Sequence, residues 1–191
     1  MPRPLIRISL VALATALTGC AGDPASLPTA ASSHLDHGAP NLTAGAAGTE
    51  GALLAQVRRA TARFHRIEVA FAEGYVQGSP CEVSAAGGMG AHFRKNALID
   101  GVIDPEHPEI LQYEPQKNGE WRLVGVEFLI RAADWDATHS EPPTYAGQPF
   151  EDRRAPGSAG PPFPNYGLHM WVWQNNPSGV FAPWNPTVNC L

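Results

Sequence analysis

The sequence predicts an α+β protein of one domain, in which a long N-terminal helix packs on a curved antiparallel β-sheet or a small open barrel. Two observations support this class. Apolar residues recur at three- and four-residue steps over 52–73, the period of a helix with one buried face. After this segment, short apolar runs alternate with glycine- and asparagine-containing turns, a pattern that is typical of antiparallel strands.

The helix is expected over 52–73 because neither proline nor glycine interrupts its apolar stripe. Gly74 is the expected end of the helix, since glycine accepts the left-handed conformation of a helix C-cap. The stripe consists of Leu53, Val57, Ala60, Phe64, Ile67 and Phe71.

Strands are expected at 89–93, 110–113, 121–131 and 166–173, with a hairpin turn at Asn118-Gly119. Both faces of the strand 121–131 are mostly apolar, which predicts a central strand covered on each side. Its alternation places Val124, Val126, Phe128 and Ile130 on one face and Leu123, Gly125, Glu127 and Leu129 on the other. The proline-rich segment 133–165 is expected to be a partly ordered flap.

The N-terminus is predicted to be an export signal rather than part of the fold. Residues 1–19 combine a basic start with an apolar run that is too short to span a bilayer. The sequence Leu17-Thr18-Gly19-Cys20 resembles the lipobox of bacterial lipoproteins, which implies cleavage before Cys20 and lipidation of that residue. Residues 20–50 contain almost no large apolar side chains and are expected to form a disordered tether, so that the globular domain covers 51–191.

The number of cysteines indicates the redox environment of the protein, and its net charge limits the kinds of partner that it can bind. Lipidation of Cys20 leaves Cys81 and Cys190, which we expect to form a disulfide in an oxidising compartment. The net charge is −5 and no basic cluster lies outside the predicted helix, which argues against a nucleic-acid partner. The expected location is therefore the bacterial cell envelope, with the membrane contacted through the N-terminal lipid, and the sequence indicates no oligomeric state.

Three polar residues lie within apolar strands and define the candidate site. His92, Glu127 and His169 each have a glycine two residues away, and residues two apart share a strand face, so open space is expected beside each. Two imidazoles and a carboxylate suit a divalent transition metal, with coordination positions left for water or substrate. If the three strands are neighbours, a two-histidine, one-carboxylate metalloenzyme site is one hypothesis.

Two other interpretations remain open. In the first, the same residues hold a small polar ligand in an aromatic-lined pocket, together with Tyr113, Tyr75 and Trp171. In the second, the histidines belong to the core and Glu127 pairs with an arginine such as Arg94, in a structural or partner-binding envelope protein with an exposed apolar patch at 171–184.

Three further clusters of polar residues are expected to be ordinary solvated groups. They are the pair His34 and His37 in the tether, the pair His65 and Glu68 on the helix, and the trio Asp134, Asp136 and His139.

Several segments together resemble a family of exported bacterial domains of unknown function. The resemblance covers roughly 52–191 and implies a single extracytoplasmic domain without implying any catalytic residue. The segments that carry it are Ala72-Glu73-Gly74-Tyr75, Gly88-Met89-Gly90-Ala91-His92-Phe93, Asp104-Pro105, Pro108-Glu109-Ile110-Leu111-Gln112-Tyr113-Glu114-Pro115, Leu123-Val124-Gly125-Val126-Glu127 and Leu168-His169-Met170-Trp171-Val172-Trp173.

Overall fold

A computed structural model describes residues 42–191, with side chains from residue 49 onward. The predicted signal peptide, Cys20, most of the predicted tether and the pair His34 and His37 lie outside the described residues. Among the residues that are described, no helix is both long enough and apolar enough to cross a membrane.

The N-terminal helical region is interrupted, which corrects the prediction of one continuous helix over 52–73. Helix α1 (Leu42–Thr61) is followed by a 3-10 turn, η1 (Ala62–His65), and by helix α2 (Ile67–Ala72). The carbonyl of Phe64, which a continuous helix would use four residues later, instead accepts a 2.6 Å hydrogen bond from the hydroxyl of Tyr113. A tertiary hydrogen bond thus competes with the helix at this point. Gly74, at φ +93°, ends α2 as predicted.

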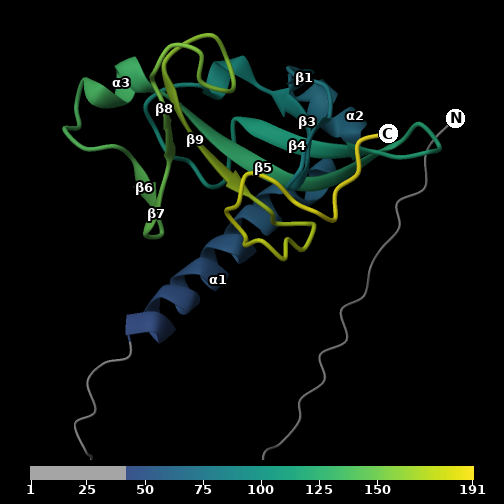
Figure 1. The fold of residues 1–191 in the computed structure, drawn as a ribbon, viewed down its shortest axis with the longest axis horizontal. Helices are drawn as coiled ribbons and strands as arrows, with labels where there is room; N and C mark the ends of the chain where they lie inside the picture. Colours follow the sequence, from purple (N-terminus) through teal and green to yellow (C-terminus); the bar gives the residue numbers. More distant parts are fainter. Residues whose placement is uncertain (1–41) are drawn as a thin grey trace, which may run out of the picture. The chain divides into compact units, whose positions relative to one another are not determined.

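An open antiparallel sheet forms the centre of the fold, in the order β1-β3-β4-β5-β9-β8, with β2 also paired to β3 (Figure 1). It confirms the α+β class, but the sheet does not close into a barrel. Its strands are β1 (Val76–Gln77), β2 (Glu82–Ser84), β3 (Gly87–Arg94), β4 (Ile110–Pro115), β5 (Trp121–Arg131), β8 (Glu151–Arg153) and β9 (Asn165–Met170).

The connections are short elements. A 3-10 turn, η2 (Asn96–Leu98), follows β3, and β4 and β5 are joined at the predicted turn, where Gly119 has φ +83°. The segment expected to be a flap contains α3 (Ala132–Asp136), the hairpin β6 (Thr144–Tyr145) and β7 (Gln148–Pro149), and the edge strand β8.

The two faces of the sheet differ in chemistry. The core face is apolar and packs against α1, η1 and α2 through residues that include Leu53, Val57, Phe64, Phe93, Tyr113 and Phe128. The opposite face, here named the site face, carries Arg94, His92, Gln112, Glu127 and His169 on neighbouring strands.

The alternation of β5 breaks at one position, which corrects the predicted face of two residues. Leu123 packs in the core cluster, whereas Val124 packs with Trp171 and Val188 in a separate cluster. The pairing of β4 with β5 shifts register between Gln112 and Tyr113, and this bulge rotates the strand between the two residues. From Val126 onward the predicted alternation holds.

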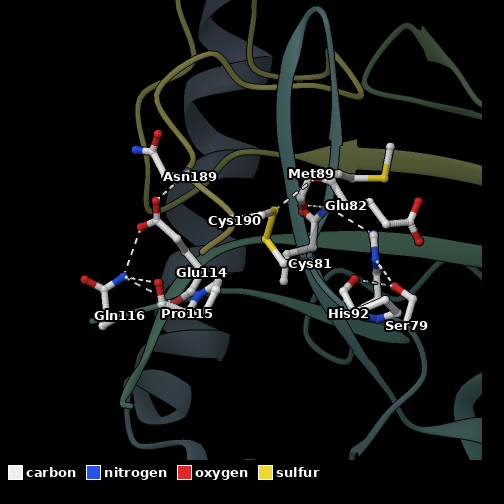
Figure 2. Close-up of a disulfide and its surroundings, with 12 residues drawn as sticks. Ser79, Cys81, Glu82, Met89, His92, Glu114, Pro115, Gln116, Asn189 and Cys190 are labelled. Carbon is white, nitrogen blue, oxygen red and sulfur yellow. Dashed lines mark hydrogen bonds between the residues drawn. A yellow bond between two sulfur atoms is a disulfide. The ribbon is translucent and has the colours of Figure 1, made fainter. Parts of the chain in front are cut away.

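The predicted disulfide between Cys81 and Cys190 is present, with a Cα–Cα distance of 5.4 Å (Figure 2). Beside it, Gly88 and Asn185 exchange two backbone hydrogen bonds of 3.0 and 2.9 Å, so the C-terminal segment lies along the start of β3. A disulfide indicates an oxidising environment, which agrees with the exported location that we expect.

Candidate metal centre

The structure brings the three predicted site residues together on the site face. His92 lies on β3, Glu127 on β5 and His169 on β9, where His169 is the direct pairing partner of Glu127. One potential ligand atom from each residue lies within 4.8 Å of the other two, and all three residues are buried. Nε2 of His92 is 3.7 Å from Oε2 of Glu127, and Nε2 of His169 is 3.8 Å from Oε1.

These separations are close to those of a metal site. An ion with ligand distances of about 2.0–2.1 Å places neighbouring ligand atoms about 3.4 Å apart in a tetrahedron. The 3.7 Å between Nε2 of His92 and Oε2 of Glu127 exceeds this by a few tenths of an ångström, and one ligand atom from each of the three residues lies within 4.8 Å of the others. No other group of three or more histidine, cysteine, aspartate or glutamate side chains converges in this way within the described part of the chain.

Strand β4 lies between β3 and β5 and contributes Gln112, which pairs with His92 on one side and with Gly125 on the other. A Cβ on Gly125 would lie 2.7 Å from Oε1 of Gln112, so this glycine leaves room for the amide. The open space predicted beside Glu127 is therefore filled by a polar side chain from the neighbouring strand.

Arg153 on β8 completes the site and was not among the residues predicted from the sequence. Its Nη1 lies 2.6 Å from Oε1 of Glu127, and both side chains are almost fully buried, with exposures of 6% and 3%. Arg153 passes directly over Gly167, where a Cβ would lie only 2.5 Å from Nη1. The partner of Glu127 is thus Arg153, not Arg94 as one interpretation supposed. A glycine facing a buried carboxylate was the only local signal that a large side chain would enter here.

Both ring nitrogens of His92 have polar neighbours. Nδ1 lies 2.9 Å from the hydroxyl of Ser79, which also lies 3.1 Å from the carbonyl of Pro80. When this hydroxyl donates to Pro80, its oxygen accepts from Nδ1–H of His92, and Nε2 then carries a lone pair. Nε2 lies 3.4 Å from the amide nitrogen of Gln112 and 3.7 Å from Oε2 of Glu127.

Buried polar atoms without partners gather at this point. Nε2 of His169 and Oε1 of Gln112 have no hydrogen-bond partner among the described residues. Buried polar atoms without partners are uncommon and costly. A cation placed among these atoms would satisfy several of them together.

Electrostatics keep the histidines neutral and the carboxylate ionised. Burial lowers the pKa of His169 to about 4, and it also lowers the pKa of His92. Burial alone would raise the pKa of Glu127, but the interactions with His169, Arg153 and His92 outweigh it and hold that pKa at about 2. Neutral imidazoles and an ionised carboxylate are the forms that bind metal ions.

A cavity of about 340 Å³ opens beside the three residues. Its charged wall contains Arg94, Glu82, Glu151 and Arg153 in addition to the site residues. Its apolar wall is formed by Met89 and Ile110 together with residues from two distant segments, namely Ala159–Pro162 before β9 and Pro183 with Trp184 in the C-terminal segment.

Three residues that we expected at the ligand site lie elsewhere. The hydroxyl of Tyr75 donates to the carbonyl of Pro108 at 2.8 Å, and the hydroxyl of Tyr113 donates to Phe64, both within the core face. Trp171 donates from Nε1 to the carbonyl of Ala182 and packs with Val124 and Val188. None of these three lines the cavity, because their tertiary hydrogen bonds and packing hold them away from it.

The two remaining polar clusters in the described region do not form metal sites. The ring of His65 packs edge-on against Trp173 at 4.3 Å between centroids. Asp134 pairs with Arg131, Asp136 pairs with Arg154, and His139 stacks on Trp135. Each of these four side chains thus contacts another side chain of the fold.

Comparison of the chain with protein-family models, with curated proteins and with solved structures found no match. The resemblance to exported bacterial domains therefore stays a prediction.

Proposed function

We propose that this protein is an envelope lipoprotein whose domain binds a divalent transition-metal ion through His92, Glu127 and His169. The observation that carries the proposal is the convergence of two imidazole nitrogens and a carboxylate within 4.8 Å of one another. Nε2 of His92 lies 3.7 Å from Oε2 of Glu127, beyond hydrogen-bonding distance, and Nε2 of His169 has no partner among the described residues.

The groups around the three residues support the same function. Metal-binding histidines usually hydrogen-bond through their other ring nitrogen to a fixed group, and Nδ1 of His92 lies 2.9 Å from the hydroxyl of Ser79. Arg153 occupies Oε1 of Glu127 and leaves Oε2 for an ion. Three protein ligands leave further coordination positions, and these would face the cavity, where an ion acts as a Lewis acid or activates water.

The direct test is the metal content of the full chain, purified from an oxidising compartment without a histidine tag and incubated with Zn²⁺ or Mn²⁺. We expect about one ion per chain, and at least a tenfold loss of affinity in His92→Ala and in His169→Ala. His139→Ala is the matched control, because it removes an exposed imidazole outside the site. Failure of the intact protein to retain any divalent ion overturns the proposal.

Absorption spectroscopy on the unmutated protein guards against variants that fail to fold. X-ray absorption of the loaded protein should show two imidazoles and only nitrogen or oxygen ligands. Sulfur at the ion would contradict the assignment, since Cys81 and Cys190 are joined in the disulfide.

A second candidate function is a metal-free pocket for a small polar ligand. The ion pair between Glu127 and Arg153 favours it, because the buried carboxylate already has a cationic partner at 2.6 Å. A protein that binds no metal but is stabilised against heat by small polar compounds would support this candidate. A partner-binding role has less support, since Trp171 is 2% exposed and 171–184 forms no exposed apolar patch.

The membrane anchor is tested separately. Cys20→Ser should move the protein from the membrane fraction to the soluble fraction and abolish labelling by palmitate. Retention in the membrane fraction would exclude Cys20 as the anchor.

A further inference from the structure

Arg94 is a cation of the cavity wall that no carboxylate neutralises. It lies on β3 two residues after His92, and it pairs across the sheet with Ile110, which in turn pairs with Glu127. Arg94 and Glu127 are therefore in one row on the site face, two strands apart, which corresponds to about 10 Å between their backbones.

The side chain of Arg94 is held in place by packing, but its guanidinium lacks an ion-pair partner in the described region. Its Nε is buried and has no hydrogen-bond partner, and no ion pair of Arg94 is present in the described region. A Cβ on Gly78 would lie 3.1 Å from Cδ of Arg94, so the arginine stem packs closely on the backbone there. By contrast, Arg122, Arg131, Arg153 and Arg154 each pair with a carboxylate. A packed but unpaired guanidinium beside a cavity indicates an anionic ligand.

We infer that Arg94 binds the carboxylate of a small organic monoanion whose apolar body lies against Trp184 and the prolines of the cavity wall. The inference rests on the proposed function for the second anchor of the carboxylate, which is the metal ion. A cavity of about 340 Å³ accepts a molecule of this size, and the apolar wall of Met89, Pro161, Pro162, Pro183 and Trp184 excludes a fully polar one.

Charge balance selects a monoanion. The cavity wall carries the two arginines Arg94 and Arg153 against the three glutamates Glu82, Glu127 and Glu151, a net charge of −1 when the histidines are neutral. A divalent ion changes this to +1, which one carboxylate neutralises. A phosphate dianion would overcompensate the charge and would approach Glu82 and Glu151 unfavourably.

Benzoate is a suitable probe, with benzamide as its neutral isostere and inorganic phosphate as the competing anion. We expect the zinc-loaded full chain to bind benzoate with a Kd below about 1 mM by calorimetry. Benzamide should bind at least tenfold more weakly, and Arg94→Gln should weaken benzoate by about ten- to a hundredfold, the usual effect of losing a charged hydrogen bond. Arg59→Gln, on an exposed position of α1, is the matched control and should have no effect.

Metal content measured on the same samples separates the two proposals. Absence of benzoate binding to the loaded protein, equal binding by Arg94→Gln, or tighter binding of phosphate than of benzoate overturns the carboxylate site and leaves the metal site standing. Arg94-dependent benzoate binding by a chain that retains no metal supports the carboxylate site and overturns the metal site.

Discussion

The two faces of the sheet differ in whether their buried polar groups have hydrogen-bond partners. On the core face the hydroxyls of Tyr75 and Tyr113 both donate to backbone carbonyls, and apolar side chains fill the remaining space. On the site face Arg94, Gln112 and His169 each carry a buried polar atom without a partner; the fourth such atom in the described chain is Oδ1 of Asn165. The polar groups of the core face are therefore paired within the fold, whereas the site face has buried polar atoms that lack partners. This difference indicates that a ligand binds at the site face.

The largest expected effect is at the one strong ion pair of the site face. Arg153→Met leaves Glu127 as a buried, unpaired carboxylate and should lower the free energy of unfolding by about 3–5 kcal/mol in a denaturant titration. Arg154→Met, at the exposed neighbouring position, should change stability far less. The double variant Glu127→Gln/Arg153→Met should recover much of the loss, and equal losses in the two single variants would remove the distinction between the faces.

A methyl group added to the site face should have the next largest effect. In Gly167→Ala the new Cβ would lie 2.5 Å from Nη1 of Arg153 and 2.8 Å from Oε1 of Glu127, so the ion pair must move. We expect a loss of about 1–3 kcal/mol, together with weaker metal binding. Gly51→Ala is the control, because nothing lies within 4 Å of its added Cβ. Unchanged stability in Gly167→Ala would mean that the ion pair is not held as tightly as its geometry indicates.

Glu109 makes the free energy of unfolding depend on pH in a way that the site histidines do not. Burial raises its pKa to about 8 although its Oε2 accepts a hydrogen bond from the backbone N–H of Leu129. In the unfolded chain Glu109 ionises near 4.5 and each site histidine near 6.5, so at pH 6.5 the protons bound by the two unfolded histidines offset the proton held by folded Glu109. Between about pH 7 and 8 Glu109 dominates the difference in bound protons. Stability should then fall as pH rises, by less than the roughly 1.4 kcal/mol per pH unit that one whole proton gives.

The variant Glu109→Gln should remove this fall in stability in thermal unfolding measured at pH 7, 7.5 and 8. Asp104→Asn is the control, since the side chain of Asp104 is 47% exposed and its pKa is lowered, mainly by its hydrogen bond to His107. A slope that persists in Glu109→Gln would assign the proton to another group.

The smallest expected effect is on the core face. Tyr113→Phe removes the hydroxyl that donates to Phe64 and should cost about 1–2 kcal/mol by leaving that buried carbonyl unpaired. Metal and benzoate binding should be unchanged, because Tyr113 is on the face away from the cavity. A change in either binding constant would show that the two faces are coupled.

Much of the fold could be predicted from local pattern, because local pattern determines it. The hairpin at Gly119, the stop at Gly74 and the disulfide follow from turn chemistry and from the number of cysteines. The continuous helix was a wrong prediction, since the hydroxyl that takes the carbonyl of Phe64 comes from a residue 49 positions later. Competition from a distant hydroxyl for a helix carbonyl does not alter the apolar repeat from which a helix is predicted.

The site, like the fold, could be predicted from the sequence only in part. Glycines beside His92, Glu127 and His169 indicated space, and the structure fills the space beside Glu127 with Gln112 and Arg153. Arg153 itself could not be identified, because it lies in a proline-rich segment whose sequence predicts a loop. Tyr75, Tyr113 and Trp171 were placed at the ligand by their aromatic character, which does not distinguish a core from a pocket.

The disulfide also determines what a protease can do to this protein. Cys81 and Cys190 are 109 residues apart, and the covalent ring that they close contains His92, Glu127 and His169 together. A single cut in the irregular segment between β7 and β9 would leave His92 and Glu127 on one fragment and His169 on the other, yet the fragments would stay joined. A nicked molecule would therefore run as one band on a non-reducing gel, and only a thiol reagent would reveal that it had been cut.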